Sequence, residues 1–514
     1  MLFLFALVPE VLVSPLATPS SPPLAAQPLT SQSFSVGQAR PTPSRPMRLP
    51  PPSDVITPQD LLPPAMRALP PQEIMQPQEM RRLPGQLDNV PVFNSNSPEV
   101  VQQSGILLST FPPEGMRSPH AHLNYAFQGR FDIFTHHVSR VRAPGDPTSL
   151  FQGILLYNPS DRPVTLNILQ AASYLTRPDA IFITLPPYVE DPIGRVYAGP
   201  GSRVANDILR GRRQGIWQPT IVIPPRQSHL LMNLPIPVGD KLNDDLPASN
   251  ARSTLMRVAS DGPLYIANLA LYAARNPDGT ERPPTFEDWQ QLLINGDLVT
   301  PRDLVPTPLS QQTGMSTEPA DRFTYGRVAG VSLGSKWTAI LTDKPSVNYL
   351  SIPRRGHSFS YGLNTLYRGR LSTGQIQTAP LIVRYPDTAY QAHGNYGVEY
   401  NLTLPLYNPT PQTQRVTISV QTPLKEDQTK GGLVFYDPPE ERVFFRGTVR
   451  LRFADGRGGT ETRFFHLVQK RGQQGEPLLI LTMPAGSRTS VEVDFLYPAD
   501  ATPPQVLTVT TLDQ

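Results

Sequence analysis

Two stretches that lie far apart in the chain carry nearly the same pattern. They are LLYNPSDRPVTLNIL, residues 155–169, and PLYNPTPQTQRVTISV, residues 405–420. In each stretch an apolar run ends in Tyr-Asn-Pro followed by Ser or Thr, a combination that forces a turn. Alternating apolar and polar residues then supply a second strand. The repeated pattern predicts two related β-hairpins.

Two further pairs of stretches match in the same order along the chain. LNYAFQGRF contains Gly129 and LNTLYRGRL contains Gly369, while IPPRQS and MPAGSR contain Pro224 and Pro484. Ordered matches whose spacing grows slowly are typical of a duplicated domain with small loop insertions. We therefore expect Tyr157, Gly129 and Pro224 to occupy the same positions in the first copy as Tyr407, Gly369 and Pro484 in the second.

The composition favours strands and turns over helices. The 514 residues include 62 prolines, which helix-rich folds do not tolerate and turn-rich β folds do. In RSTLMRVASDGPLYIANLALYA, residues 252–273, the sequence Asp261-Gly262 predicts a tight hairpin between two strands. We predict an all-β fold of two duplicated β-sandwich domains, immunoglobulin-like or related, after a proline-rich N-terminal extension.

The domain boundaries follow from shifts in composition. We predict a signal peptide at 1–26, a proline-rich disordered or extended linker at 27–90, and sandwich domains at 91–275 and 323–514. The linker 276–322 contains a helix at 285–295, where Thr285 and Asp288 can form a capping box and Gly296 can end the helix in the left-handed conformation. Phe286, Trp289, Leu292 and Leu293 form an apolar face that we expect to dock on a sandwich.

Composition also excludes several classes of function. The absence of cysteine excludes disulfides, thiolate metal sites and a cysteine nucleophile. The net charge of +3 without dense basic runs is not typical of a nucleic-acid-binding protein. The N-terminal apolar run is interrupted by Pro9 and Glu10, so it indicates an export signal rather than a membrane span.

Several motifs resemble a known family. LPGQLDNVPVFNSNSPE, GILLSTFPPEG, FQGRFDIFTHH, GPGSRVANDILRGRRQ, DTAYQAHGNYGVEYNLTLPLYN and YPADATPPQVLTVTTL are similar to an uncharacterised cyanobacterial family of predicted exported proteins, domain of unknown function 3370. The resemblance covers nearly all of the chain from about Arg82 onward. It implies a periplasmic or cell-envelope location and brings no catalytic residues.

The richest group of polar and aromatic residues is RYPDTAYQAHGNYGVEY, residues 384–400. Tyrosine rings can stack on sugar faces and polar side chains can bind hydroxyls, although the same tyrosines can also pack beneath a tight loop. Asp387 and Glu399 can further be interpreted as a glycosidase pair. The candidate ligand-binding residues are Tyr385, Asp387, Tyr390, His393, Asn395, Tyr396 and Glu399.

Three weaker candidates complete the list. GPGSRVANDILRGRRQ predicts an anion site at a helix N-terminus, formed by Ser202, Arg203, Arg210, Arg212 and Arg213. His120, His122, His136 and His137 have a spacing that metal sites use, but nearby carboxylates are lacking, so no metal and no cofactor are expected. Ser332 in GVSLG matches a nucleophile elbow, but the residues that follow favour a strand over the required helix.

Taken together, these patterns predict a non-enzymatic exported envelope protein with a structural or adhesive role. The alternative is a module that binds cell-wall or extracellular polysaccharide, and an enzyme acting on polysaccharide is the third hypothesis. The expected partners are such a polysaccharide or another envelope protein, and not nucleic acid.

Overall fold

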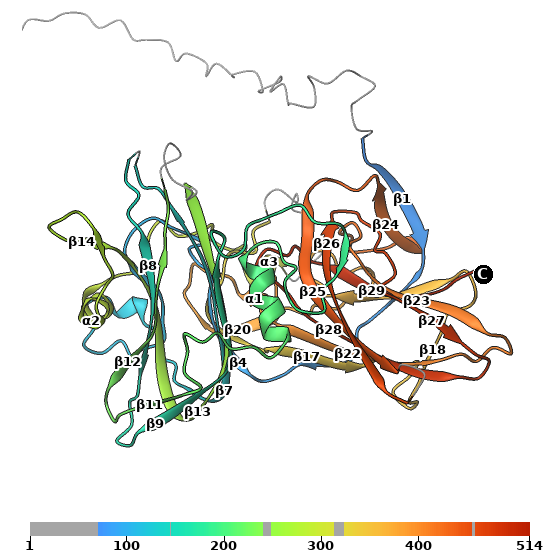
Figure 1. Ribbon diagram of the computed structural model, residues 1–514, viewed down its shortest axis with the longest axis horizontal. Coiled ribbons are helices and arrows are strands. Elements are labelled where there is room, and N and C mark those ends of the chain that lie inside the picture. Colours follow the sequence, from blue (N-terminus) through green and yellow to red (C-terminus); the bar gives the residue numbers. More distant parts are fainter. Residues whose placement is uncertain (1–69, 144, 240–247, 313–322, 455–457, 514) are drawn as a thin grey trace, which may run out of the picture. The chain divides into compact units, whose positions relative to one another are not determined.

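The computed structural model describes residues 70–143, 145–239, 248–312, 323–454 and 458–513. The predicted signal peptide and residues 27–69 of the predicted linker lie outside these ranges. Residues 69–514 form one compact unit. Within it, the regular secondary structure of the described residues is mostly β-strand, which confirms the all-β prediction (Figure 1).

The larger sheet system belongs mainly to the first half of the chain. Its main path runs β11 (Thr220–Ile223), β9 (Val164–Leu175), β13 (Ser249–Tyr272), β7 (Phe127–Arg140), β4 (Pro91–Ser95), β16 (Ala329–Leu333), β20 (Ala379–Arg384) and β21 (Gln391–Ala392). β5 (Val100–Val101) pairs with β7. The C-terminal part of β13 pairs with β8 (Leu150–Tyr157) and β6 (Gly105–Ser109), and β12 (Ser228–Ile236) pairs with β8.

The second half of the chain builds two further sheets. One runs β10 (Tyr188–Glu190), β26 (Thr460–Lys470), β25 (Val443–Ala454), β28 (Arg488–Leu496), β22 (Glu399–Tyr407), β17 (Lys336–Ile340) and β3 (Gln86–Leu87), with β18 (Leu350–Ser351) on β22. The other runs β2 (Glu79–Arg81), β19 (Ser358–Leu363), β29 (Gln505–Thr511), β23 (Gln414–Gln421) and β27 (Leu479–Met483). β1 (Gln72–Pro77) pairs with β24 (Gly432–Asp437), and β14 (Ala274–Arg275) with β15 (Glu281–Arg282).

Each half buries its core between two sheets, as a β-sandwich does. Alternate residues of β22, from Tyr400 to Leu406, are buried and pack against Phe359 and Val509 from the opposing sheet. In the first half, Ile154 on β8 packs in one cluster with Phe131 on β7. The two-residue periodicity of these strands therefore places one face of each in a core.

The pairing registers demonstrate a shared architecture. The order β11-β9-β13-β7-β4 recurs as β27-β23-β29-β19-β2, and in both sets every neighbouring pair is antiparallel except the last, which is parallel. Tyr157 ends β8 opposite Ser228, and Tyr407 ends β22 opposite Arg488. Pro224 and Pro484 each follow the matching edge strand. The predicted equivalence of these two residue pairs is confirmed.

The predicted equivalence of Gly129 and Gly369 is wrong. Gly129 lies within β7, opposite Ser260 on β13. Gly369 lies in a loop after β19, which is the counterpart of β7. Both glycines have positive φ, at 72° and 98°. The similarity of the two sequence stretches around them therefore reflects a shared local conformation and not equivalent positions in the two sandwiches.

The hairpin predicted at Asp261-Gly262 is also absent from the structure. β13 runs through this point as one strand and passes from one sheet to the other, with a register shift against β7 between Ser260 and Leu264. A Cβ atom on Gly262 would lie 2.6 Å from Val164 Cγ2. The glycine therefore permits close packing at the crossing rather than a reversal of the chain.

Strand exchange joins the two halves. β1, β2 and β3, from the segment predicted to be an extended linker, pair within the second half. In the opposite direction, β16 and β20 follow the predicted boundary at 322/323 but pair in the first half's sheet. β10 crosses over to pair with β26. The predicted boundaries therefore do not separate two self-contained sandwiches.

Helix α1 (Pro200–Leu209) fills the junction between the halves, as Figure 1 shows. Its apolar residues Val204 and Ile208 pack with Leu255 on β13 and Leu496 on β28. A buried ion pair also crosses the junction, because Arg257 on β13 lies 2.6 Å from Glu399 on β22. The halves are thus held together by apolar packing and by charge.

The predicted helix in the 276–322 segment is confirmed as α2 (Phe286–Asn295), and the Thr285–Asp288 capping box is present. Trp289 and Leu293 are buried against the first half, with Phe286 and Leu292 partly buried beside them. The predicted left-handed end is wrong, because Gly296 has φ −80° and is extended. Within the described ranges, the remaining short helices are η2 (Pro119–Ala121) and α3 (Leu309–Gln312).

Candidate functional site

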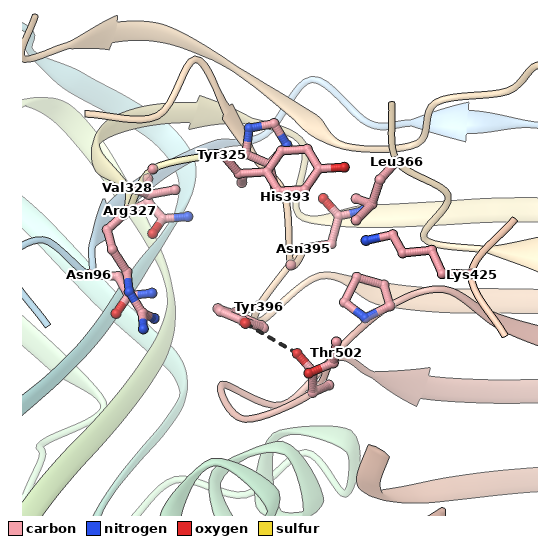
Figure 2. Close-up of a pocket in the computed structure, with 16 residues that line it drawn as sticks. Asn96, Tyr325, Arg327, Val328, Leu366, His393, Asn395, Tyr396, Lys425 and Thr502 are labelled. Carbon is pink, nitrogen blue, oxygen red and sulfur yellow. Dashed lines mark hydrogen bonds between the residues drawn. The ribbon is translucent and has the colours of Figure 1, made fainter. Parts of the chain in front are cut away.

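A cavity of about 280 Å³ lies where loops of the second half meet strands of the first. Three predicted ligand residues, His393, Asn395 and Tyr396, line it, as Figure 2 shows. The other walls come from the end of β4 and the chain before β16, and from loops of the second half. These lining residues are Asn94, Asn96, Tyr325, Gly326, Arg327, Val328, Leu366, Ala392, Gly394, Lys425, Ala501, Thr502 and Pro503.

The loop between β21 and β22 has a fixed shape. Asn395 has φ 47°, and its side-chain carbonyl accepts from Ala379 N at 3.0 Å while its amide donates to Gln377 O at 2.9 Å. Asparagine tolerates this left-handed conformation better than most residues. A Cβ atom on Gly394 would lie 2.3 Å from the ring of Tyr396, so glycine is required there. The cavity wall is therefore preorganised.

His393 is the most unusual residue of the cavity. It is only 8% exposed, and neither ring nitrogen has a hydrogen-bond partner within the described ranges. Its ring lies 4.3 Å from that of Tyr325. Burial, with a smaller contribution from Lys425, lowers the pKa of His393 to about 3, so the imidazole is neutral and offers one donor and one acceptor.

A second unpartnered polar atom belongs to the same wall. Asn96 is 3% exposed and its Oδ1 atom has no partner among the residues described. Buried polar groups without partners cost free energy, and each one in a native protein calls for an explanation, of which a bound ligand or water is one. Tyr396 is better satisfied, because its hydroxyl donates to Ala501 O at 3.2 Å. Burial raises its pKa to about 12, which keeps the hydroxyl neutral.

The four other predicted ligand residues lie outside the cavity. Tyr385 is in the first half's core, where its hydroxyl donates to Ala121 O at 2.7 Å and accepts from Ser109 N at 3.0 Å. Tyr390 stacks under Arg384, at 3.9 Å, and Asp387 pairs with Arg302 at 2.9 Å. Glu399 is held by Arg257. These residues fix the loop rather than face a ligand.

Glu399 and Asp387 do not form a glycosidase pair. Burial raises the pKa of Glu399, but Arg257 and Lys336 outweigh burial, and the pKa lies below its ordinary value. A general acid needs a raised pKa instead. Asp387 belongs to a different ion pair, with Arg302, and neither carboxyl lines the cavity.

The predicted anion site is not assembled. Ser202 Oγ donates within its own helix turn, to Ala198 O at 2.8 Å, and Arg203 stacks on Tyr174 at 3.9 Å. Arg210 and Arg212 follow the C-terminal end of α1, not its N-terminus. They pair with Asp191 at 3.4 Å and Asp207 at 2.8 Å, and Arg213 donates to Ile168 O at 3.1 Å.

The histidine and serine motifs have structural partners. His137 is fully buried and bonds Ser95 Oγ at 3.0 Å and Pro98 O at 2.9 Å, and His122 bonds Ser109 Oγ at 2.8 Å. Within the described ranges, no three histidine, aspartate or glutamate residues are grouped to hold a metal ion. Ser332 is buried within β16, without the strand-turn-helix that a nucleophile elbow needs.

The sequence did not indicate Tyr325, Lys425 or Asn96. None of the three belongs to a dense polar and aromatic motif like residues 384–400. The pairing of β4 with β16 and the fold of the second half bring them close to His393. The only local signal is the polar and charged run Lys-Glu-Asp-Gln-Thr-Lys at residues 425–430.

Comparisons with known proteins identify the family. The fold is that of an all-β protein of paired sandwiches. The chain belongs to the family described as Protein of unknown function (DUF3370), which matches residues 78–511. The predicted membership of this family of unknown function is therefore confirmed. No curated protein matches the chain.

The solved structures that show some similarity are remote. They include Lac15 from a marine microbial metagenome, with 10% identity over 81% of this chain and 97% of that chain and a TM-score of 0.10. Recombinant pro-11S globulin of pumpkin shows 11% identity over 80% and 86%, with a TM-score of 0.08. Procruciferin, an 11S globulin from Brassica napus, shows 11% over 80% and 85%, with a TM-score of 0.09. TM-scores this low carry no argument about fold or function.

None of the helices in the described part of the chain has the length and apolar character needed to cross a membrane.

Proposed function

We propose that this chain is a non-enzymatic exported protein of the cyanobacterial cell envelope that binds a cell-wall or extracellular polysaccharide in the junction cavity. The observation that carries the proposal is His393, a buried neutral imidazole without a partner, beside the Tyr325 ring in a preformed cavity. Export and a cyanobacterial source rest on the N-terminal sequence and on the family resemblance.

The chemistry of the cavity suits a sugar. Aromatic rings stack on the apolar faces of sugars, while amide and imidazole groups exchange hydrogen bonds with hydroxyls. Tyr325 and Tyr396 provide the rings, and Asn96 and His393 provide the unpartnered polar atoms. Ligand pockets span roughly 300–1,000 Å³. The junction cavity, at about 280 Å³, is at the small end of this range, so it suits a small ligand group such as one sugar residue at the end or branch of a chain.

A purely structural or adhesive role is the second candidate. The strand exchange and the buried Arg257–Glu399 pair support it, because both lock the halves into one rigid unit. A rigid unit on a proline-rich extension is a suitable spacer. This role requires no ligand in the cavity.

Binding by the purified full-length protein separates the two candidates. We expect it to sediment with peptidoglycan or to bind acidic exopolysaccharide, and we expect neither glycan to be degraded. His393→Leu removes both imidazole nitrogens and should weaken binding about tenfold, the effect of about 1.4 kcal/mol. Tyr390→Leu is the matched control, because Tyr390 is close to His393 in the chain, just before β21, but lies outside the cavity.

Equal binding by wild type and His393→Leu would refute the cavity as the site. A protein that binds no glycan but retains its fold would favour the structural role, and release of sugar products would show an enzyme. Fractionation of cells and N-terminal sequencing of the mature protein test export. An intact Met1 in a cytoplasmic fraction would contradict it.

A further inference from the structure

The wall of the junction cavity carries positive charge and no negative charge. Among its sixteen lining residues are Arg327 and Lys425, and none is aspartate or glutamate. Figure 2 shows the two cations on opposite sides of the view, with His393 and Asn395 between them. A cavity lined in this way favours an anion over a neutral ligand of the same shape.

The two cations differ in what they contact. Arg327 forms an ion pair with Glu99, so its charge is already compensated. Lys425 has no ion pair with any described residue, and its ammonium lies 5.4 Å from the ring of Tyr325. The nearest acid, Asp427, is engaged elsewhere, because it accepts from Gly369 N at 2.8 Å and pairs with Arg370 at 3.4 Å.

The position of Lys425 makes it accessible to a ligand. The residue as a whole is exposed, and it also lines the cavity. Burial of the ammonium group, opposed by Asp427 and assisted by Arg368, lowers the pKa of Lys425 to about 8. The amine therefore still carries its charge in most molecules at neutral pH, and a bound anion would favour that charged form.

We infer that the sugar residue held in the junction cavity is negatively charged, with a carboxylate or sulfate that pairs with Lys425. This inference rests on the proposed function and specifies its substrate class as an acidic polysaccharide. The His393 ring nitrogens and Asn96 Oδ1 remain available for hydroxyl groups, because none of these atoms has a hydrogen-bond partner among the described residues. A charge-assisted hydrogen bond to a lysine is stronger than a neutral one and gives preference for the charged sugar.

Calorimetric titration of the full-length protein tests the inference. The probes are short oligosaccharides of galacturonic acid, of galactose, and of sulfated galactose. At low salt we expect both acidic probes to bind about tenfold more tightly than the neutral one. The preference should shrink at about 0.5 M salt, because charges in contact with solvent are screened. A preference for only one acidic probe identifies which anion the site takes.

Variants of Lys425 give the decisive comparison. Lys425→Gln should abolish the preference by weakening binding of both acidic probes about tenfold, whereas Lys425→Arg should retain it. Lys430→Gln is the control, because Lys430 is exposed and lies outside the cavity. If wild type binds acidic and neutral probes equally, or Lys425→Gln keeps the preference, the inference is wrong while the proposed glycan binding stands. Failure of all probes and polysaccharides to bind would overturn the proposed function itself.

Discussion

The paired asparagines that follow Tyr157 and Tyr407 allow a quantitative test of the duplicated architecture. Asn408 is fully buried, and its Nδ2 atom lies 2.8, 2.9 and 3.0 Å from the carbonyl oxygens of Gln412, Met483 and Pro484. Its Oδ1 atom accepts from Thr410 N at 3.0 Å and from Thr410 Oγ1 at 2.7 Å. This one side chain ties the turn to the adjoining edge strand.

Replacing Asn408 by alanine removes this set of bonds. Two N–H groups can make at most two full bonds to the three carbonyls, and the oxygen accepts two more, so about four bonds are lost. At about 1 kcal/mol each, we expect the free energy of unfolding to fall by about 4 kcal/mol. Asn408→Asp keeps the acceptor but places a carboxylate against three carbonyl oxygens, so we expect it to cost at least as much.

Urea unfolding of the full-length protein, followed by circular dichroism, measures these changes. Asn89→Ala is the control, because Asn89 is exposed and forms no side-chain hydrogen bond with the described residues. It should change stability by less than about 0.5 kcal/mol. A cost below about 1 kcal/mol for Asn408→Ala would refute the reasoning.

The same substitution in the first half tests whether the two turns are equivalent. Asn158 Nδ2 lies 2.7, 3.0 and 3.1 Å from the carbonyl oxygens of Arg162, Ile223 and Pro224, and Ser160 takes the place of Thr410. Because every bond has its counterpart, Asn158→Ala should cost the same as Asn408→Ala to within about 1 kcal/mol. Costs that differ by several kcal/mol would contradict the equivalence.

Two further predictions concern buried charge. Glu399→Gln removes the carboxylate that lies 2.6 Å from Arg257 and leaves Arg257 only the more distant Asp132, at 3.9 Å. Since the side chains of Arg257 and Glu399 are both under 10% exposed, we expect a loss of about 3 kcal/mol in urea unfolding. Asp161→Asn, at an exposed pair, should cost under about 1 kcal/mol, and equal costs would contradict this. Burial lowers the pKa of His137 from 6.5 to about 4, so the unfolded state binds the proton first as the pH falls. The free energy of unfolding therefore decreases by up to about 1.4 kcal/mol per pH unit between pH 6.5 and 4. His137→Gln should make this slope shallower, whereas the control His357→Gln, at an exposed residue, should not; an unchanged slope in His137→Gln would contradict the prediction.

Local chemistry explains what the sequence predicted well. The Tyr-Asn-Pro-Ser/Thr turns and the Thr285 capping box depend on hydrogen bonds between residues two or three positions apart, so the local sequence alone determines their geometry. The core-facing alternation of β22 is equally local. These features gave the fold class and the position of α2.

Long-range pairing explains what the sequence did not predict. Gly262 was interpreted as a turn residue, but its role is set by Val164 on a neighbouring strand, almost a hundred residues away. The arginines after Ser202 were placed near a helix N-terminus, yet Asp191 and Asp207 hold two of them at the other end. A single sequence contains no signal for such partners, because long-range strand pairing, and not proximity along the chain, brings the two residues together.

The candidate site shows both effects at once. His393, Asn395 and Tyr396 were found because they lie in one dense polar and aromatic loop, whereas Tyr385 and Glu399 in the same stretch are required by the core and by Arg257. A tyrosine that faces a ligand and a tyrosine that packs in the core are the same residue type in the sequence. Only their burial and their hydrogen-bond or ion-pair partners in the structure distinguish them.

The position of the cavity follows from the strand exchange. β16 follows the predicted domain boundary but pairs with β4, and the residues just before it, Arg327 and Val328, form one wall of the cavity. Asn96, just after β4, stands on the same side, whereas Lys425 and Thr502 belong to the second half. Neither sandwich alone could build this site. Under the proposed function, a ligand held there contacts both halves, so its binding stabilises their junction. The same ligand supplies the hydrogen-bond partner that the buried imidazole of His393 lacks among the described residues.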